Sequence, residues 1–270
     1  MPLDRVAQRG RRALGVVSLA LLLAGSLATS AHAASVGLGS ADAFSVLGAS
    51  TVTNTGPSTL TGDLGVSPGT AITGFPPGTV NGSTHPNDGV AQRAQADLTT
   101  AYNDARGRSS TATVSADLAG RTLSPGVYTS ATSLVLSGDL TLDAQGDPSA
   151  VFVFQAGSTL TTASGSHVLL IGGAQACNVF WVVDTATLGA ATAFKGNILA
   201  LTSISLTTGA TLDGRALARN GAVSLDTNTV TRASGAAAPA PTPTPGPAAT
   251  PTPTPTPGPA ATPTPTPTPG

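Results

Sequence analysis

Side chains capable of acid–base, nucleophilic or metal chemistry are few in this 270-residue sequence. Glutamate is absent, and the only histidines beyond residue 33, His85 and His167, lie far apart. Glycoside hydrolysis commonly needs two carboxylates of different pKa, and no aspartate pair stands out for that role. No G-x-S-x-G nucleophile motif occurs. Cys177, the only cysteine, precedes an apolar strand and is expected to be a small buried hydrophobe. The sequence therefore predicts no catalytic residues, no enzyme activity and no cofactor.

Two further groups of polar residues have competing interpretations. Asp139, Asp143 and Asp147 are spaced by four, but their surroundings favour turns built on aspartate hydrogen bonds over calcium ligation. A β-helix polysaccharide lyase would combine an acidic calcium site with a basic residue, and the bases available are Lys195, Arg215 and Arg219. No aspartate cluster accompanies these bases, so we expect neither a bound metal nor lyase chemistry.

Hydroxyl groups, in contrast, are abundant and regularly spaced. Thr-x-Thr pairs begin at Thr51, Thr53, Thr59, Thr159, Thr185, Thr227 and Thr229. On a strand, residues i and i+2 point to the same side about 6.6–6.8 Å apart, and adjacent strands lie about 4.7–4.9 Å apart. Stacked strands of this kind would form a flat grid of methyl and hydroxyl groups. The alternative is that threonine is only a good β-former on a solvated face.

The elements that must position these hydroxyls are short strands separated by Gly, Asp, Asn and Ser. The clearest strand patterns cover residues 151–155, 178–183, 203–207 and 222–226. Thr-Leu pairs recur at Leu160, Leu188 and Leu212, which are 28 and 24 residues apart, about the length of one β-helix coil. A β-sandwich with chance similarity between segments is the alternative. The side chains predicted to fill the interior are Val52, Leu160, Ile204, Leu206, Val223 and Leu225.

One segment has a helical pattern. The apolar residues that fall on one helical face are Val90, Ala94, Leu98, Ala101, Tyr102 and Ala105. Asn87 or Asp88 can cap the start of this helix, and Gly107 can end it. We therefore expect a helix over roughly Asp88–Arg106, packed along the side of a flat sheet.

Both ends of the chain differ from this domain. Residues 1–33 combine arginines, an apolar run and a final Ala-x-Ala, which is the pattern of a secretory signal peptide. Residues 236–270 alternate Pro and Thr, which predicts an extended, disordered tail. Residues 34–235 remain for one compact domain. Beyond residue 33, eight Lys and Arg stand against twelve Asp, and a formal charge of −4 gives no support for nucleic-acid binding.

Six ordered segments carry a resemblance to a known family. They read LGSADAFSVLGASTVTNTGPSTLTGDLGVSPG, NGSTHPNDGVAQRAQADLTTAYNDA, LSPGVYTS, LTLDAQGDPSAVFVFQAGSTL, GAQACNVFWVV and FKGNILALTSISLTTGATLDGRALARNGAVSLDTNTV. Over about residues 38–231 the sequence resembles the microbial ice-binding (antifreeze) proteins. The resemblance implies a mainly β fold: a right-handed, discontinuous, roughly triangular β-helix (a β-solenoid) with one long α-helix packed alongside.

The resemblance also implies adsorption to ice through one flat β-face, often with Thr-Ala/Gly-x-Thr/Asn motifs. Residues 70–73 and 208–211 match that pattern. Residues that alternate with inward apolar side chains are the candidates for the ice-binding face: Thr51, Thr53, Thr159, Thr161, Thr185, Thr187, Ser203, Ser205 and Thr207. Strand parity alone does not decide whether these residues stack on one face. Asp226, expected to project outward beside Leu225, would interrupt a uniform grid.

Two classes of function follow. The first is a secreted, monomeric ice-binding protein, extracellular or associated with the cell envelope, whose partner is the surface of an ice crystal. The second is a cell-envelope or matrix adhesin without ice activity, in which the tail holds a rigid β-helix away from a cell wall. A flat β-face of low charge favours the first, and an aromatic or strongly polar patch favours the second.

Overall fold

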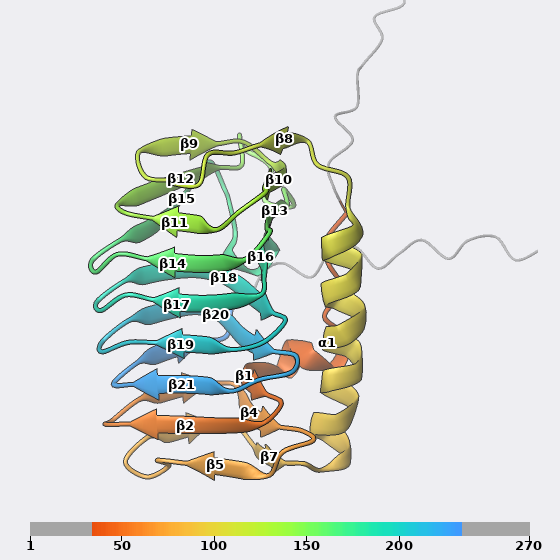
Figure 1. The fold of residues 1–270 in the computed structure, drawn as a ribbon, viewed down its shortest axis with the longest axis vertical. Helices are drawn as coiled ribbons and strands as arrows, with labels where there is room; N and C mark the ends of the chain where they lie inside the picture. Colours follow the sequence, from red (N-terminus) through yellow and green to blue (C-terminus); the bar gives the residue numbers. More distant parts are fainter. Residues whose placement is uncertain (1–33, 234–270) are drawn as a thin grey trace, which may run out of the picture. The chain divides into compact units, whose positions relative to one another are not determined.

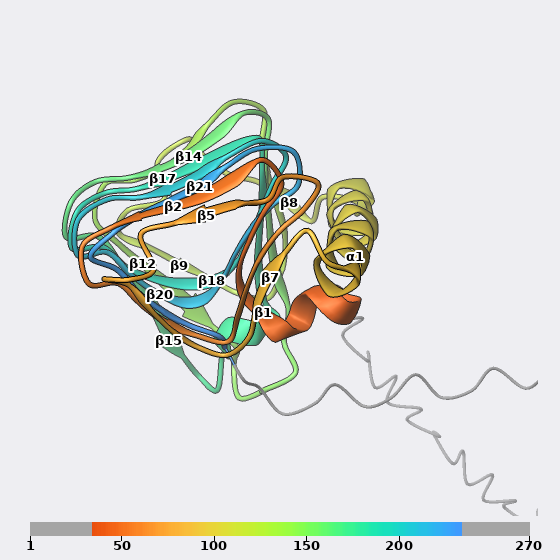
Figure 2. The same cartoon turned by 90° about the horizontal axis from the view of Figure 1, so that it is seen from below.

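The computed structural model describes residues 34–233, which form a three-sided β-helix with one long α-helix alongside (Figures 1 and 2). Every strand pairing in this range is parallel, which rules out the antiparallel sandwich and confirms the predicted mainly β, β-helical fold. The predicted signal peptide and the predicted tail lie outside the described residues.

A seven-stranded sheet makes one side of the β-helix, and we call its outer surface the threonine face. In stacking order its strands are β11 (Leu134–Leu136), β14 (Thr159–Thr162), β17 (Thr185–Leu188), β19 (Ile204–Leu206), β21 (Val223–Asp226), β2 (Thr51–Thr55) and β5 (Ala71–Thr73).

A second, fifteen-stranded sheet bends to make the other two sides. The helix face consists of β8 (Ala112–Thr113), β10 (Gly126–Ser130), β13 (Phe152–Ala156), β16 (Val179–Val183), the second halves of β18 (Ala193–Ala200) and β20 (Thr211–Ala218), β1 (Phe44–Gly48), β4 (Asp63–Val66) and β7 (Thr84–Pro86). The ion-pair face consists of β9 (Arg121–Leu123), β12 (Asp139–Asp143), β15 (His167–Ile171), the first halves of β18 and β20, β22 (Thr229–Thr231), β3 (Thr59–Thr61) and β6 (Thr79–Asn81).

The bend between these two sides needs glycine. Gly196 of β18 and Gly214 of β20 are paired at the corner, and both have positive φ angles. A Cβ atom on Gly214 would lie 1.9 Å from the carbonyl oxygen of Gly196. Successive coils can therefore turn sharply at this corner only because no side chain is present.

The β-helix is discontinuous. The chain first builds β1 to β7, then crosses the whole stack as α1 (Gly89–Gly107) and returns from the opposite end with β8 to β22 (Figure 1). The last coil docks on the first, because β20 pairs with β1, β21 with β2, and β22 with β3. Residues about 170 apart in sequence thus become neighbours in the middle of the stack.

The interior is filled largely by apolar side chains that stack in register. A row of inward side chains runs Tyr128, Phe154, Trp181, Ile198 and Ala216, each paired with the next. The Phe154 and Trp181 rings stack at a centroid distance of 4.1 Å, and the buried indole N–H of Trp181 donates to the Lys195 carbonyl at 2.9 Å. All six interior residues predicted from the sequence are buried, which confirms that prediction.

Helix α1 lies against the helix face, as predicted, and Asp88 caps its start by accepting from the backbone of Val90 and Ala91. Five of the six predicted apolar contacts are buried; the exception is Val90, which is 47% exposed, and Ala91 is buried in its stead. The end of α1 is held by the Gln155 side chain, whose amide donates to the Ala105 carbonyl at 2.8 Å. Within residues 34–233, no helix is long and apolar enough to cross a membrane.

The Thr-Leu repeat does not mark equivalent positions, contrary to the sequence-based interpretation. Leu160 pairs with Ala186 rather than with Leu188, and Leu212 lies on the ion-pair face. The number of residues per coil varies, because the loops at the corners of the β-helix differ in length. The paired residues Leu160, Ala186 and Ile204 are therefore not evenly spaced in sequence. The β-helix prediction was right, but the repeat behind it was not the structural repeat.

The two ends of the described chain lie away from the threonine face. Arg108, just after α1, donates to the carbonyls of Ala34 and Ser35, which places the first residues beside the helix. Arg232 follows β22 and contacts Asp42 at the corner between the ion-pair and helix faces. Ala233, the last described residue, is 5% exposed.

Candidate functional site

The central row of the threonine face is an unbroken ladder of uncharged side chains. In strand order it consists of Val135, Thr161, Thr187, Ser205, Ser224, Thr53 and Thr73, each in register with the next. Their inward neighbours, such as Leu160 and Ile204, are buried, so the alternation of the strands points the hydroxyl groups outward. Thr161, Thr187, Thr53 and Thr73 are exposed.

A second row runs parallel to the first, two residues earlier on each strand. Thr159 is paired with Thr185, and Thr51 with Ala71. Ser203 and Ala222 stand at the same place immediately before the two strands between them, and the Ala222 amide donates to Ser203 Oγ at 3.3 Å. The two rows together form a grid with a spacing of about 6.6–6.8 Å along the strands and about 4.7–4.9 Å between them.

The outer row is less regular and carries the only charge of the three rows. Thr207 and Thr55 flank Asp226, which is paired with Thr55. The hydroxyls of Thr208 and Thr227 donate to the two carboxylate oxygens of Asp226, which turns the carboxylate towards the corner of the β-helix. Asp226 therefore marks the rim of the grid and leaves the two inner rows free of charge.

The structure brings all nine predicted site residues together. Register places eight of them in the two inner rows and Thr207 in the outer row. Six members of the face were absent from the candidate list: Val135, Ser224, Thr55, Thr73, Ala71 and Ala222. The alternation of inward apolar and outward polar residues, which was applied to the other strands, also predicts Ser224 on this face. Ser224 lies between the buried residues Val223 and Leu225. The Thr-x-Thr pairs of β3 and β22 belong instead to the ion-pair face.

The three bases considered for a lyase do not converge. Arg215 is buried at a corner, where it donates to Asn197 Oδ1 at 2.8 Å and Asp42 Oδ1 at 2.7 Å, and burial lowers its pKa. Lys195 pairs with Asp213 at 3.1 Å on the ion-pair face. Arg219 lies over the ring of Tyr102, 5.8 Å from its centroid. These contacts are structural, and they hold the three bases at three separate places.

The aspartates spaced by four have two different roles. Asp143 and Asp147 accept hydrogen bonds from backbone amides two residues later, at 2.8 Å each, as expected for turns. Asp139 instead stands on a strand and pairs with His167 Nδ1 at 2.8 Å, so its predicted place in a turn was wrong. No group of three His, Cys, Asp or Glu side chains within residues 34–233 could hold a metal ion.

Cys177 differs from its predicted state. It lies in the short 3-10 helix η2 (Ala176–Asn178), and it is half-buried rather than fully buried. Burial raises the pKa of its thiol. A raised pKa disfavours the thiolate and argues against a nucleophilic role.

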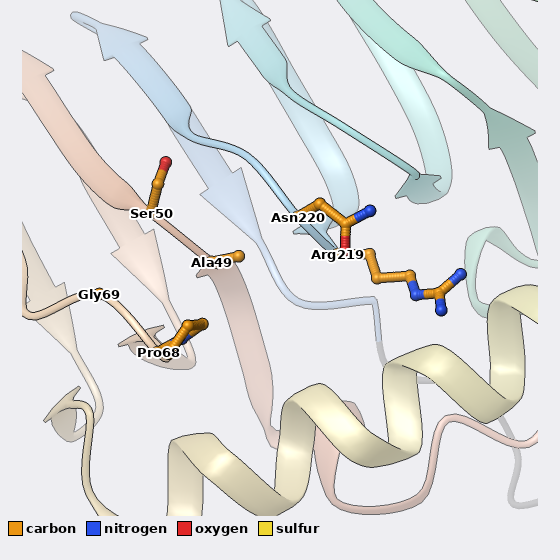
Figure 3. A pocket seen from close by; sticks show the side chains of 6 residues that line it. All are labelled: Ala49, Ser50, Pro68, Gly69, Arg219 and Asn220. Carbon is orange, nitrogen blue, oxygen red and sulfur yellow. The ribbon is translucent and has the colours of Figure 1, made fainter.

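A hollow of about 320 Å³ lies at the corner between the threonine and helix faces (Figure 3). Its lining residues are Ala49, Ser50, Pro68, Gly69, Arg219 and Asn220. None of these is a histidine, cysteine or carboxylate, so the hollow lacks the groups for acid–base or nucleophilic chemistry. The Arg219 side chain extends towards α1 rather than towards Ser50 (Figure 3).

The chain also matches a known protein family. The model of the family described as Ice-binding-like matches residues 46–231. The chain belongs to this family. The resemblance seen in the sequence is thereby confirmed.

Several relatives of this Ice-binding-like chain are similar over most of its length. The ice-binding protein of Nostoc sp. (strain HG1) is 54% identical over 221 residues, which cover 80% of this chain and 82% of that protein. The crystal structure of an ice-binding protein from an Antarctic biological consortium has 54% identity and a TM-score of 0.73, covering 74% of this chain and 92% of that one. The crystal structure of the ice-binding protein from the Antarctic ascomycete Antarctomyces psychrotrophicus has 41% identity and a TM-score of 0.73. The match covers 74% of this chain and 100% of that one.

Proposed function

We propose that this protein adsorbs to ice crystals through the threonine face and thereby inhibits ice growth and recrystallisation. The observation that carries the proposal is the unbroken register of the central row, in which seven uncharged residues follow one another from β11 to β5. The names of the relatives support the same ligand.

Adsorption to a crystal by such a surface depends on many weak contacts made at once. Each threonine contributes little, so the grid must hold its spacing without being ordered by the ice. The stacked coils supply that rigidity, because backbone hydrogen bonds and a packed core fix every strand before binding. Little conformational entropy is then lost on adsorption.

The remaining parts of the proposal concern the setting of this activity. The protein acts without catalysis, metal or cofactor, as a monomer. Residues 1–33 direct secretion, and the Pro/Thr-rich residues 236–270 form a spacer that contacts a cell wall or matrix. These statements rest on composition and on the grid, whose two inner rows contain no titratable group among the described residues.

The test is an ice-recrystallisation assay on the purified protein, combined with observation of single ice crystals at a small supercooling. We expect crystals to be shaped and grain growth to stop at a concentration at which albumin has no effect. Unshaped crystals and unrestrained grain growth would overturn the proposal and leave the adhesin hypothesis.

A further inference from the structure

Methyl groups are unevenly distributed over the threonine face. The two inner rows carry Thr159, Thr161, Thr185 and Thr187 on β14 and β17, and Thr51, Thr53 and Thr73 on β2 and β5. Between these two groups, β19, β21 and the residue before each of them present four smaller residues in the same rows: Ser203, Ser205, Ala222 and Ser224. We call these four residues the serine band.

The serine band separates two groups of threonines in the grid. Thr187, Ser205, Ser224 and Thr53 follow one another in register, so Thr187 and Thr53 are three strand spacings, about 14 Å, apart. Serine lacks the γ-methyl group of threonine and the β-branching that restricts χ1. The surface of the band therefore projects less far than the neighbouring threonines, by about one methyl group. The serine hydroxyls also have more rotational freedom about χ1.

Burial and hydrogen bonding also set the band apart. In the central row, Ser205 and Ser224 are half-buried, whereas Thr187 and Thr53 on either side are exposed. Ser224 Oγ lies 3.4 Å from the hydroxyl of Thr53, which donates to it, and Ser203 Oγ accepts from a backbone amide. Two of the three serine hydroxyls are thus engaged within the protein, and the bond to Ser224 also engages the hydroxyl of Thr53 at the edge of the band.

We propose that Ser205 and Ser224 determine the strength of adsorption, by dividing the threonine face into two patches that contact ice separately. The inference rests on the proposed function and specifies how its surface works. A rigid surface gains most when its contacts are continuous, because each further contact then costs no additional ordering. Threonine fits at both positions, since Thr161 and Thr187 already stack at the same strand spacing in this row.

The experiment is to join the two patches with the double substitution Ser205→Thr/Ser224→Thr. We expect the concentration needed for half-maximal inhibition of recrystallisation to fall about tenfold, the factor expected for two more buried methyl groups. The matched control is Ala193→Thr, which adds a threonine at an outward position of the ion-pair face, between His167 and Thr211. An unchanged or weaker activity of the double variant, with an unchanged circular dichroism spectrum, would overturn the inference, as would an equal gain in the control.

The reverse substitution keeps the inference testable if the double variant does not fold. Thr187→Ser/Thr53→Ser widens the band by one strand on each side, and we expect about a tenfold loss of activity. No loss in this variant would overturn the inference. An inactive wild-type protein would instead overturn the proposed function, so the two failures can be distinguished.

Discussion

The threonine face and the ion-pair face are built by the same coils, yet their outer surfaces differ. On the threonine face, the central row contains no charge over seven strands. On the ion-pair face, the corresponding row includes Lys195 beside Asp213, and the neighbouring row begins with Asp139 beside His167. Leu169 and Ile171 also stand out from this face, 43% and 47% exposed.

Threonine content alone does not separate the two faces. The ion-pair face has its own short ladder, in which Thr211, Thr229, Thr59 and Thr79 are in register on four adjacent strands. This ladder ends at Ala193, and the row beside it meets the Lys195–Asp213 pair. The two faces differ in the length of their ladders and in whether the ladders contain charged residues. Charge matters because a charged side chain holds water and keeps neighbouring groups away from a crystal.

The largest effect is expected from a bulky residue in the centre of the threonine face. Thr187→Tyr should raise the concentration needed to inhibit recrystallisation by at least about tenfold, because the ring lifts several neighbouring contacts off the ice. The free energy of unfolding should change by only about 1 kcal/mol or less, as at other exposed positions. Dose–response curves and thermal melts measure the two quantities.

The control for Thr187→Tyr is Thr122→Lys, at an exposed position of β9 on the ion-pair face. It should leave both quantities nearly unchanged. A loss as large as that of Thr187→Tyr would mean that the ion-pair face also contacts ice.

A smaller effect is expected from making the ion-pair face resemble the threonine face. Lys195→Thr/Asp213→Thr removes a partly exposed ion pair and adds two threonines in register with Thr231 and Thr61, which makes a row of four. Stability should change by about 1 kcal/mol or less, the usual worth of such a pair. Inhibition of recrystallisation should improve about twofold to threefold, since each added methyl is worth a fraction of a tenfold gain. No improvement in this assay would show that removing charge is insufficient and that ladder length decides.

The smallest effect on activity is expected from pH. The two inner rows have nothing to titrate, so ice activity should stay constant between about pH 5 and 9. Stability should behave differently. Hydrogen bonds from Ser40 hold the pKa of Asp97 below its ordinary value of 3.8, and those from Ser137 do the same for Asp117.

Because these folded-state pKa values are lowered, both carboxylates stabilise the fold above the ordinary pKa, and that stability is lost as pH falls through the folded value. Melting temperatures should therefore drop below about pH 4. A change of activity near neutral pH, in protein that remains folded, would implicate the charged groups of the ion-pair face.

Strand parity was predictable from the sequence, and register was not. Alternation of apolar and polar residues correctly placed Thr187 and Ser205 outward, because that alternation is a local property of each strand. Whether two strands are neighbours depends on the corners between them, which vary in length. The pairing of β2 with β21 could not be read locally, because these strands lie at opposite ends of the domain sequence.

Helix α1 shows the same contrast between local features, which the sequence predicts, and long-range contacts, which it does not. Its position followed from the spacing of residues such as Leu98 and Tyr102, and from the capping aspartate Asp88. Val90 was misplaced because the buried stripe of the first turn begins at Ala91, so Val90 lies at the edge of the stripe and its side chain faces solvent. Similarly, Asp139 was assigned to a turn because its partner, His167, is 28 residues away.

The position of the first and last described residues has a practical consequence. Ala34 lies beside α1 and Ala233 at the corner between the ion-pair and helix faces, so neither end is on the threonine face (Figure 2). A fluorescent label, a bead or a second copy joined at either residue would lie away from the threonine face. Molecules immobilised through these ends would present the same surface outward, and a coating made in this way would expose many parallel grids to freezing water.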